Sequence, residues 1–151
     1  MRYWLYKSEP DAYGIDHLKQ DKTTIWDGVR SYQARNNLTA AEIGDRAFFY
    51  HSSAKPPGIA GLMELVETGI ADPTQFDPGS KYFDPTSKAD QPRWITVRVA
   101  FVEKFSTFLS LEWLRENFVP ADLAILAKGN RLSVTPVPDP TARRLLEMAR
   151  G

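Results

Sequence analysis

Residues 26–37 contain the side chains best suited to binding a planar, polar ligand. The segment reads Trp26-Asp27-Gly28-Val29-Arg30-Ser31-Tyr32-Gln33-Ala34-Arg35-Asn36-Asn37. Val29 and Ala34 are its only aliphatic residues, whereas a segment ordered by packing normally carries several, because apolar burial is what orders a chain. Aromatic faces beside arginine and amide groups can stack on a nucleobase and hydrogen-bond to it. The segment therefore predicts a site for such a ligand; the start of a surface helix with chance aromatic residues is the alternative.

A second polar group, Lys7-Ser8-Glu9, follows an aromatic segment. Alternate residues of a strand share a face, so Lys7 and Glu9 would lie together if the strand continues, with Ser8 on the other side. A carboxylate there could accept a hydrogen bond from an exocyclic amino group. The pair could also carry out acid–base chemistry if burial shifted its pKa values. A solvated strand end is the third interpretation.

The sequence gives little support for a metal site or for nucleophilic catalysis. The chain has two histidines, His17 and His51, without carboxylates at metal-ligand spacing, so we expect no metal site. His51 and Ser52 are adjacent and would point to opposite faces of a strand, so we expect His51 to be structural or to contact a ligand, not to be catalytic. No glycine-rich phosphate loop is present, and we expect no cofactor. Arg131 and Ser133, on one face of the last predicted strand, are further binding candidates.

The elements that must position these residues follow from local patterns. Residues 3–7 read as an aromatic strand that Pro10 ends. Ser31 is a good cap for a helix over residues 32–41, on which Tyr32, Arg35 and Asn36 share a side that is free to face a ligand. Further strands are predicted over 46–51, 58–67, 94–105 and 131–135, and further helices over 15–20, 111–117 and 141–150. Two glycines within 58–67 indicate a bend or a close backbone approach.

Residues 69–93 lack a regular pattern and are rich in turn formers. A loop of this length is usually a lid, a binding loop or disordered, and Tyr82 and Phe83 argue against disorder. Strands separated by short helices, without a regular βαβ rhythm, predict an α+β domain on a curled mixed sheet or barrel. The 151 residues contain no linker and predict one domain, 1–151.

Charge and composition exclude several classes of protein. Lys+Arg and Asp+Glu both number 19, and a chain without net charge is not expected to hold a duplex mainly through its phosphates. Nucleic-acid recognition would instead be local, around a pocket. The absence of cysteine excludes disulfides and thiolate catalysis and is consistent with a reducing cytoplasm, where we expect this protein. We expect neither a signal peptide nor a membrane partner.

Taken together, these segments resemble the EVE domain. The resemblance is carried by Tyr3-Trp4-Leu5-Tyr6-Lys7-Ser8-Glu9-Pro10, residues 26–38, Gly44-Asp45, Phe49-Tyr50-His51-Ser52, Pro57-Gly58-Ile59-Ala60-Gly61, Phe76-Asp77-Pro78, Tyr82-Phe83-Asp84-Pro85, Pro92-Arg93-Trp94 and Arg131-Leu132-Ser133-Val134. Tyr6, Ser31 and Phe83 depart from the family pattern, in which methionine, asparagine and a second tyrosine are common. The lost hydroxyl at Phe83 leaves Tyr82 as the better wall for a ligand.

The resemblance implies a PUA-like fold, a small mixed β-barrel flanked by short helices, in the superfamily that also holds PUA, YTH and SRA domains. It implies binding of a modified base, in DNA more than in RNA, with the base extruded into an aromatic-lined pocket. Stand-alone copies are typical of bacteria. We accordingly expect a non-enzymatic, bacterial protein that binds a modified cytosine and has no catalytic residues.

Carried onto this sequence, the resemblance assigns a role to each candidate residue. Trp26 and Tyr82 would stack on the base, and Ser8, Glu9, Asn36 and Ser52 would contact its polar edge. Arg30, Arg35 and His51 would hold phosphate or sugar. Tyr32 belongs to the same expected site, and Lys7, Gln33, Arg131 and Ser133 are further candidates. We expect Trp26→Ala to abolish binding and to leave the fold intact.

Two alternatives come from other classes. A small PUA-like amidohydrolase acting on a modified nucleoside would use Lys7 and Glu9 as base and acid. An RNA-binding accessory protein would prefer RNA to DNA of the same sequence, because only RNA offers the 2′-hydroxyl group. The sequence predicts no oligomeric state.

Overall fold

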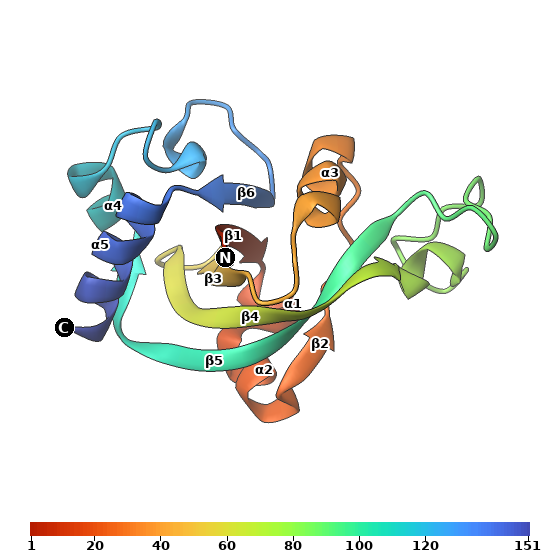
Figure 1. Ribbon diagram of the computed structural model, residues 1–151, viewed down its shortest axis with the longest axis horizontal. Helices are drawn as coiled ribbons and strands as arrows, with labels where there is room; N and C mark the ends of the chain where they lie inside the picture. Colours follow the sequence, from red (N-terminus) through yellow and green to blue (C-terminus); the bar gives the residue numbers. More distant parts are fainter.

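The computed structural model describes residues 1–151 and contains six strands and five α-helices (Figure 1). The strands are β1 (Tyr3–Ser8), β2 (Thr23–Ile25), β3 (Arg46–His51), β4 (Gly58–Ala71), β5 (Ile95–Ser110) and β6 (Val134–Val137). The helices are α1 (Pro10–Tyr13), α2 (Ile15–Asp21), α3 (Tyr32–Ala40), α4 (Leu111–Asn117) and α5 (Asp139–Arg150), with 3₁₀ turns η1 (Pro73–Phe76) and η2 (Ala124–Leu126). None of these helices is long and apolar enough to cross a membrane.

The strands form one open sheet in the order β2-β5-β4-β3-β1-β6. β1 and β3 run parallel, and every other neighbouring pair is antiparallel. The mixed sheet was expected, but the barrel is not closed, because the edge strands β2 and β6 do not pair. Helix α3 packs against β6 instead, and Asn37 Nδ2 donates to Val134 O at 2.8 Å.

Helices cover both faces of the sheet, and this produces two apolar clusters. Successive side chains of β1 point to opposite faces, so Trp4 and Tyr6 join one cluster and Leu5 joins the other. The first cluster includes residues of α2 and α3, and the second includes residues of α4 and α5. The polar end of β1 therefore extends from a strand that is buried on both sides.

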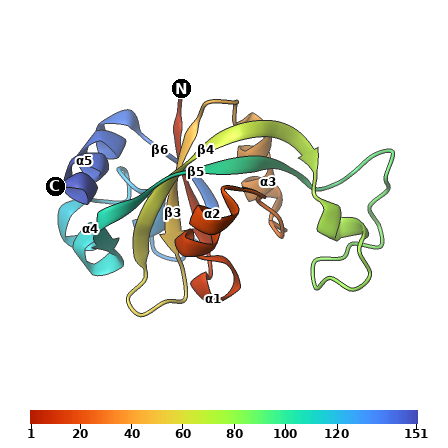
Figure 2. The same cartoon turned by 90° about the horizontal axis from the view of Figure 1, so that it is seen from below.

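The two longest strands, β4 and β5, form a bent ribbon that carries the connecting residues 72–94 away from the body (Figures 1 and 2). Four irregularities in the β4–β5 register bend it, as bulges do. At Gly61 an added Cβ would lie 2.5 Å from Glu103 O, which confirms the close approach predicted for this segment. We call residues 72–94 the arm.

Local patterns located most elements, with one consequential error. Ser31 Oγ accepts from Ala34 N at 3.4 Å and caps α3 as expected. The last strand, expected over 131–135, begins only at Val134. Asn130 Oδ1 accepts from Leu132 N at 2.9 Å and holds the preceding residues in a turn. Arg131 and Ser133 therefore do not share a face of that strand.

Candidate functional site

A cavity of about 670 Å³ opens at the end of β1, bordered by α1, β2 and the arm. Its lining residues are Lys7, Ser8, Glu9, Ala12, Tyr13, Thr24, Ile25, Trp26, Asp27, Gly28, Val29, Ser52, Lys81, Tyr82, Arg131 and Ser133. The volume is within the usual range of about 300–1,000 Å³ for small-ligand sites. The predicted residues that the fold brings together here are Lys7, Ser8, Glu9, Trp26, Ser52, Tyr82, Arg131 and Ser133.

Trp26 lines this cavity from within the core. Only 6% of the residue is exposed, and its ring packs against Tyr6 at 5.5 Å and edge-on against Phe49 at 5.3 Å between ring centroids. Its backbone N–H donates to Val97 O at 2.9 Å, and Thr96 Oγ1 donates to its carbonyl. The side chain is part of the first apolar cluster, and this argues against the expectation that Trp26→Ala would leave the fold intact.

Tyr82 enters the cavity from the arm and lies against Gly28. A Cβ at Gly28 would stand 2.7 Å from two atoms of the Tyr82 ring, and the Gly28 φ of +85° is one that other residues rarely adopt. The backbone at Gly28 is fixed by donation of its N–H to Asp72 Oδ2 at 2.8 Å. The absence of a side chain at position 28 is thus what allows the tyrosine ring to approach.

Gly28→Ala is therefore expected to destabilise the protein more than Gly44→Ala. Both glycines have positive φ, +85° and +94°, but no atom lies within 4 Å of an added Cβ at Gly44. The left-handed conformation alone costs about 1–2 kcal/mol for an alanine. We expect Gly28→Ala to cost about 1 kcal/mol more in unfolding free energy, from displacement of Tyr82. Urea denaturation of both variants measures this; equal losses would show that the ring is not tightly seated.

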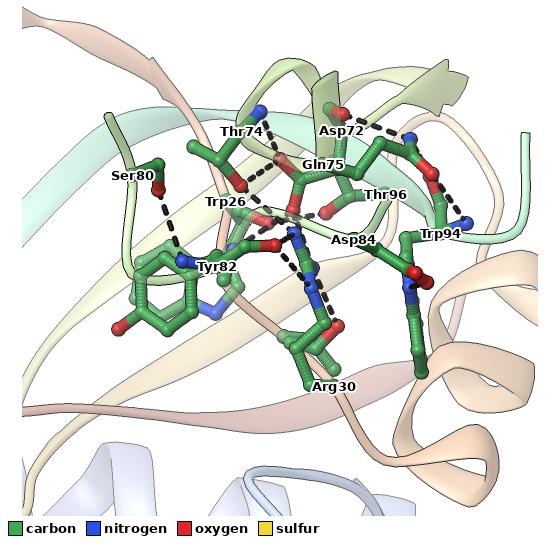
Figure 3. Close-up of polar contacts among 12 residues, drawn as sticks. Trp26, Arg30, Asp72, Thr74, Gln75, Ser80, Tyr82, Asp84, Trp94 and Thr96 are labelled. Atoms are coloured by element: carbon green, nitrogen blue, oxygen red, sulfur yellow. Dashed lines mark hydrogen bonds and ion pairs between the residues drawn. The ribbon is translucent and has the colours of Figure 1, made fainter. Parts of the chain in front are cut away.

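Arg30 fastens the arm to the body of the protein (Figure 3). Its Nε and Nη2 donate to Tyr82 O at 3.1 and 2.8 Å, and Nη2 also donates to Thr74 Oγ1 at 2.9 Å. Its Nη1 donates to Val29 O at 2.9 Å and to Asp72 Oδ2 at 3.0 Å. The sequence assigned Arg30 to phosphate or sugar, but these bonds occupy its guanidinium within the protein, and it does not line the cavity. In the structure, Arg30 positions Tyr82.

The arm is ordered around a buried amide. Gln75 Nε2 donates to Asp72 O and Trp94 O, each at 2.8 Å, while its Oε1 accepts from Ser87 Oγ at 2.6 Å and Trp94 N at 3.1 Å. Gln75 is fully buried. Trp94 Nε1 also donates to Asp84 Oδ2 at 2.8 Å. The arm is therefore an ordered segment that forms one side of the cavity. This agrees with the prediction, made from Tyr82 and Phe83, that residues 69–93 are not disordered.

Lys7, Ser8 and Glu9 all line the cavity, although strand alternation placed Ser8 opposite the other two. The reason is that β1 ends at Ser8, and Glu9 already forms the N-cap of α1. Ser8 Oγ donates to Tyr13 O at 2.6 Å. Burial lowers the pKa of Lys7. The chain direction changes here, so three successive residues border one space.

The cavity also contains charged groups that the sequence analysis did not select. Lys81 and Asp27 belong to the lining, and Asp27 lay inside the segment that the sequence marked for its chemistry. Partial burial raises the pKa of Asp27, and the nearby charge of Asp72 raises it further. The three lining cations, Lys7, Lys81 and Arg131, are outside all seven ion pairs of the structure.

The remaining predicted residues lie elsewhere. Tyr32 stacks on Trp94 with ring centroids 5.1 Å apart, and the Arg35 guanidinium lies 4.8 Å from the centre of the Tyr32 ring. Arg35 donates to Arg93 O at 2.9 Å and to Asn36 Oδ1 at 3.1 Å. These side chains hold α3 against the base of the arm and do not line the cavity.

His51 and Gln33 are also outside the lining. His51 Nε2 accepts from Ile15 N at 3.1 Å, and burial lowers the pKa of this imidazole. This bond gives His51 a structural role at the start of α2. Gln33 is solvent-exposed on α3.

An open mixed sheet with helices on both faces, and a cavity at the end of β1, defines a PUA-like domain. The chain belongs to the EVE domain family, whose model matches residues 2–148. The family and the α+β class predicted from the sequence are both confirmed.

Two solved structures and a mouse protein are similar to this chain over most of its length. The human THYN1 protein, solved in complex with DNA containing 5-methylcytosine, is 38% identical with a TM-score of 0.93, over 100% of this chain and 99% of that one. PSPTO5229 from Pseudomonas syringae is 41% identical with a TM-score of 0.93, over 97% and 99%. Thymocyte nuclear protein 1 of Mus musculus is 46% identical over 153 aligned positions, which span 89% of this chain and 68% of the mouse protein.

Proposed function

We propose that this protein is a non-enzymatic reader of modified cytosine in DNA, with the base extruded from its strand into the cavity. The observation that carries the proposal is the cavity itself, which combines the aromatic rings of Trp26 and Tyr82 with cations that form no ion pair within the protein. The human relative solved with DNA containing 5-methylcytosine supports the choice of ligand.

The lining suggests how the ligand would be held. Tyr82 is half-buried and would stack on the base, with the exposed part of Trp26 beneath it. Ser8, Glu9 and Ser52 would contact the polar edge of the base, as predicted from the sequence. Lys7, Lys81, Arg131 and Ser133 would contact the sugar and phosphates.

The expected affinity is moderate and higher for single strands. Extrusion of a paired base costs a few kcal/mol, and stacking of about 1–3 kcal/mol per base only roughly offsets this cost. An unpaired strand avoids most of the cost. If the three lining cations each neutralise one phosphate, the plot of log K against log salt for a single strand has a slope of about −2.

Fluorescence polarisation tests the proposal with short oligonucleotides, single- and double-stranded, that differ at one cytosine: plain, methylated, hydroxymethylated or formylated. We expect at least one modification to raise affinity about tenfold or more, equivalent to about 1.4 kcal/mol. Tyr82→Ala should remove most of this affinity. Phe83→Ala, which changes the neighbouring aromatic residue outside the lining, should not. Equal affinity for all cytosines would refute modified-base reading, and a preference for RNA would favour the RNA-binding alternative.

The amidohydrolase alternative depends on Lys7 and Glu9, which do share the cavity. Burial lowers the pKa of Lys7, which is the direction of shift that a general base requires. If the wild-type protein released acetate from N4-acetylcytidine and Glu9→Gln did not, the protein would be an amidohydrolase and not a non-enzymatic reader. We expect no turnover.

A further inference from the structure

We infer that Asp27 sets the base selectivity of the cavity, its carboxylate accepting a hydrogen bond from the exocyclic amino group of cytosine and thereby excluding thymine. The inference rests on the proposed function. It identifies the feature of the base that the site must read and the residue that reads it.

Thymine is the competitor that a 5-methylcytosine reader must reject. Both bases are flat pyrimidines with a methyl group at position 5, so stacking and shape cannot separate them. They differ at position 4, where cytosine has an amino donor and thymine has a carbonyl acceptor, and at N3, which carries a hydrogen only in thymine. Selectivity therefore requires a protein group that accepts a hydrogen bond and cannot donate one.

Few groups in the cavity meet this requirement. A lysine ammonium and an arginine guanidinium only donate, so Lys7, Lys81 and Arg131 cannot accept from an amino group. A hydroxyl group both donates and accepts, so it can rotate to suit either base. Glu9 and Asp27 carry the carboxylates of the lining, and a carboxylate accepts hydrogen bonds without donating any. If thymine entered the cavity, such a carboxylate would face the carbonyl oxygen at position 4, and two acceptors cannot form a hydrogen bond with each other.

Position favours Asp27 over Glu9. Asp27 lies between Trp26 and Gly28, whose backbone N–H groups are fixed by Val97 O at 2.9 Å and Asp72 Oδ2 at 2.8 Å. Because the Tyr82 ring lies against Gly28, the Asp27 carboxylate is attached beside the aromatic wall.

The Asp27 carboxylate is also available to a ligand. It forms no ion pair and no hydrogen bond to another side chain of the protein. Partial burial and the charge of Asp72 raise its pKa, while the charge of Arg30 and the backbone N–H of Asp27 itself lower it. A ligand amino group would add a hydrogen-bond donor from outside the protein. Glu9, by contrast, sits at the N-cap of α1 with a longer and more mobile side chain.

The test compares wild type with Asp27→Asn on single-stranded oligonucleotides that contain no other thymine and differ only in 5-methylcytosine or thymine at one position. An asparagine amide can accept from the amino group or donate to the carbonyl, so it should tolerate both bases. We expect wild type to bind 5-methylcytosine about tenfold or more tightly than thymine, which is within the range of one good base contact. For Asp27→Asn we expect this ratio to fall below about threefold. Asp11→Asn, which removes the same charge from an exposed position of α1 outside the lining, should retain the wild-type ratio.

The outcomes separate this inference from the proposed function. If wild type prefers 5-methylcytosine over both cytosine and thymine, and folded Asp27→Asn keeps that ratio, the inference fails and modified-base reading stands. Collapse of the ratio in Glu9→Gln but not in Asp27→Asn would transfer the role to Glu9 and overturn it. If wild type binds plain, methylated, hydroxymethylated and formylated cytosine with equal affinity, the proposed function itself fails. Thermal unfolding of each variant confirms that the fold is retained.

Discussion

Replacing Trp26 with alanine is expected to lower the free energy of unfolding by about 3–5 kcal/mol, the usual cost of removing a buried tryptophan side chain. The residue is 6% exposed and packs on Tyr6 and Phe49, so its loss leaves a void between β1, β3 and the segment that follows β2. Urea denaturation followed by circular dichroism measures the change.

Trp113→Ala is the matched control, because this tryptophan is only half-buried beside the second apolar cluster and should cost less. A Trp26→Ala variant within about 1 kcal/mol of wild type would contradict the core role of the residue. The prediction also decides how binding data are interpreted. Loss of ligand binding in Trp26→Ala would combine the effect of unfolding with the loss of an aromatic ring from the cavity. Tyr82→Ala removes only the aromatic ring, because the bonds from Arg30 to the backbone carbonyl of residue 82 are retained.

Asp72→Ala is expected to lower the free energy of unfolding by up to about 3–5 kcal/mol, because it removes the buried carboxylate of a partly buried ion pair together with its hydrogen bonds. Asp72 is 1% exposed and accepts from Gly28 N, Arg30 Nη1 and Thr74 N. Without it, the Arg30 guanidinium loses its ion-pair partner, and the joint between the arm and the body loosens. We therefore expect weaker ligand binding as well as a lower unfolding free energy.

The exposed pair Arg98–Glu67 provides the control, since its N–O distance of 3.0 Å equals that of Arg30–Asp72. Glu67→Ala should cost no more than about 1 kcal/mol, as is typical of surface ion pairs. Similar losses in Asp72→Ala and Glu67→Ala would show that burial of the Arg30 pair contributes nothing. Chemical denaturation of the two variants under identical conditions distinguishes the cases.

The sequence predicted those parts of the fold that local patterns determine. Strand alternation and helix spacing located β3 and α4 with the observed bounds and α3 to within one residue. The sequence did not predict that the sheet stays open. Whether the edge strands β2 and β6 meet depends on contacts between segments that are far apart in the chain. The start of β6 was misplaced for a related reason: the Asn130 side chain, not residue preference, holds Leu132 in a turn.

The site was predicted in part, since composition identifies the chemistry of a segment but not the direction of its side chains. Residues 26–37 do contain cavity residues, yet Arg30, Tyr32 and Arg35 face the arm. Arginine beside aromatic rings is equally suited to binding a ligand and to joining two segments of a protein. Here the partners of Arg30 in the arm are 42 to 52 residues away in the chain, a separation that local patterns do not report.

The pairing of β1 with both β3 and β6 determines when this cavity can form during synthesis. β1 is the first strand to be made and β6 the last, and Lys7 N donates to Ser133 O at the cavity edge. Contacts between segments so far apart in the chain form slowly, because the intervening loop must close first. A growing chain can thus complete the first apolar cluster only after its final strand has docked. Ligand-binding competence is therefore acquired at the end of folding, and a stalled or shortened chain would lack it.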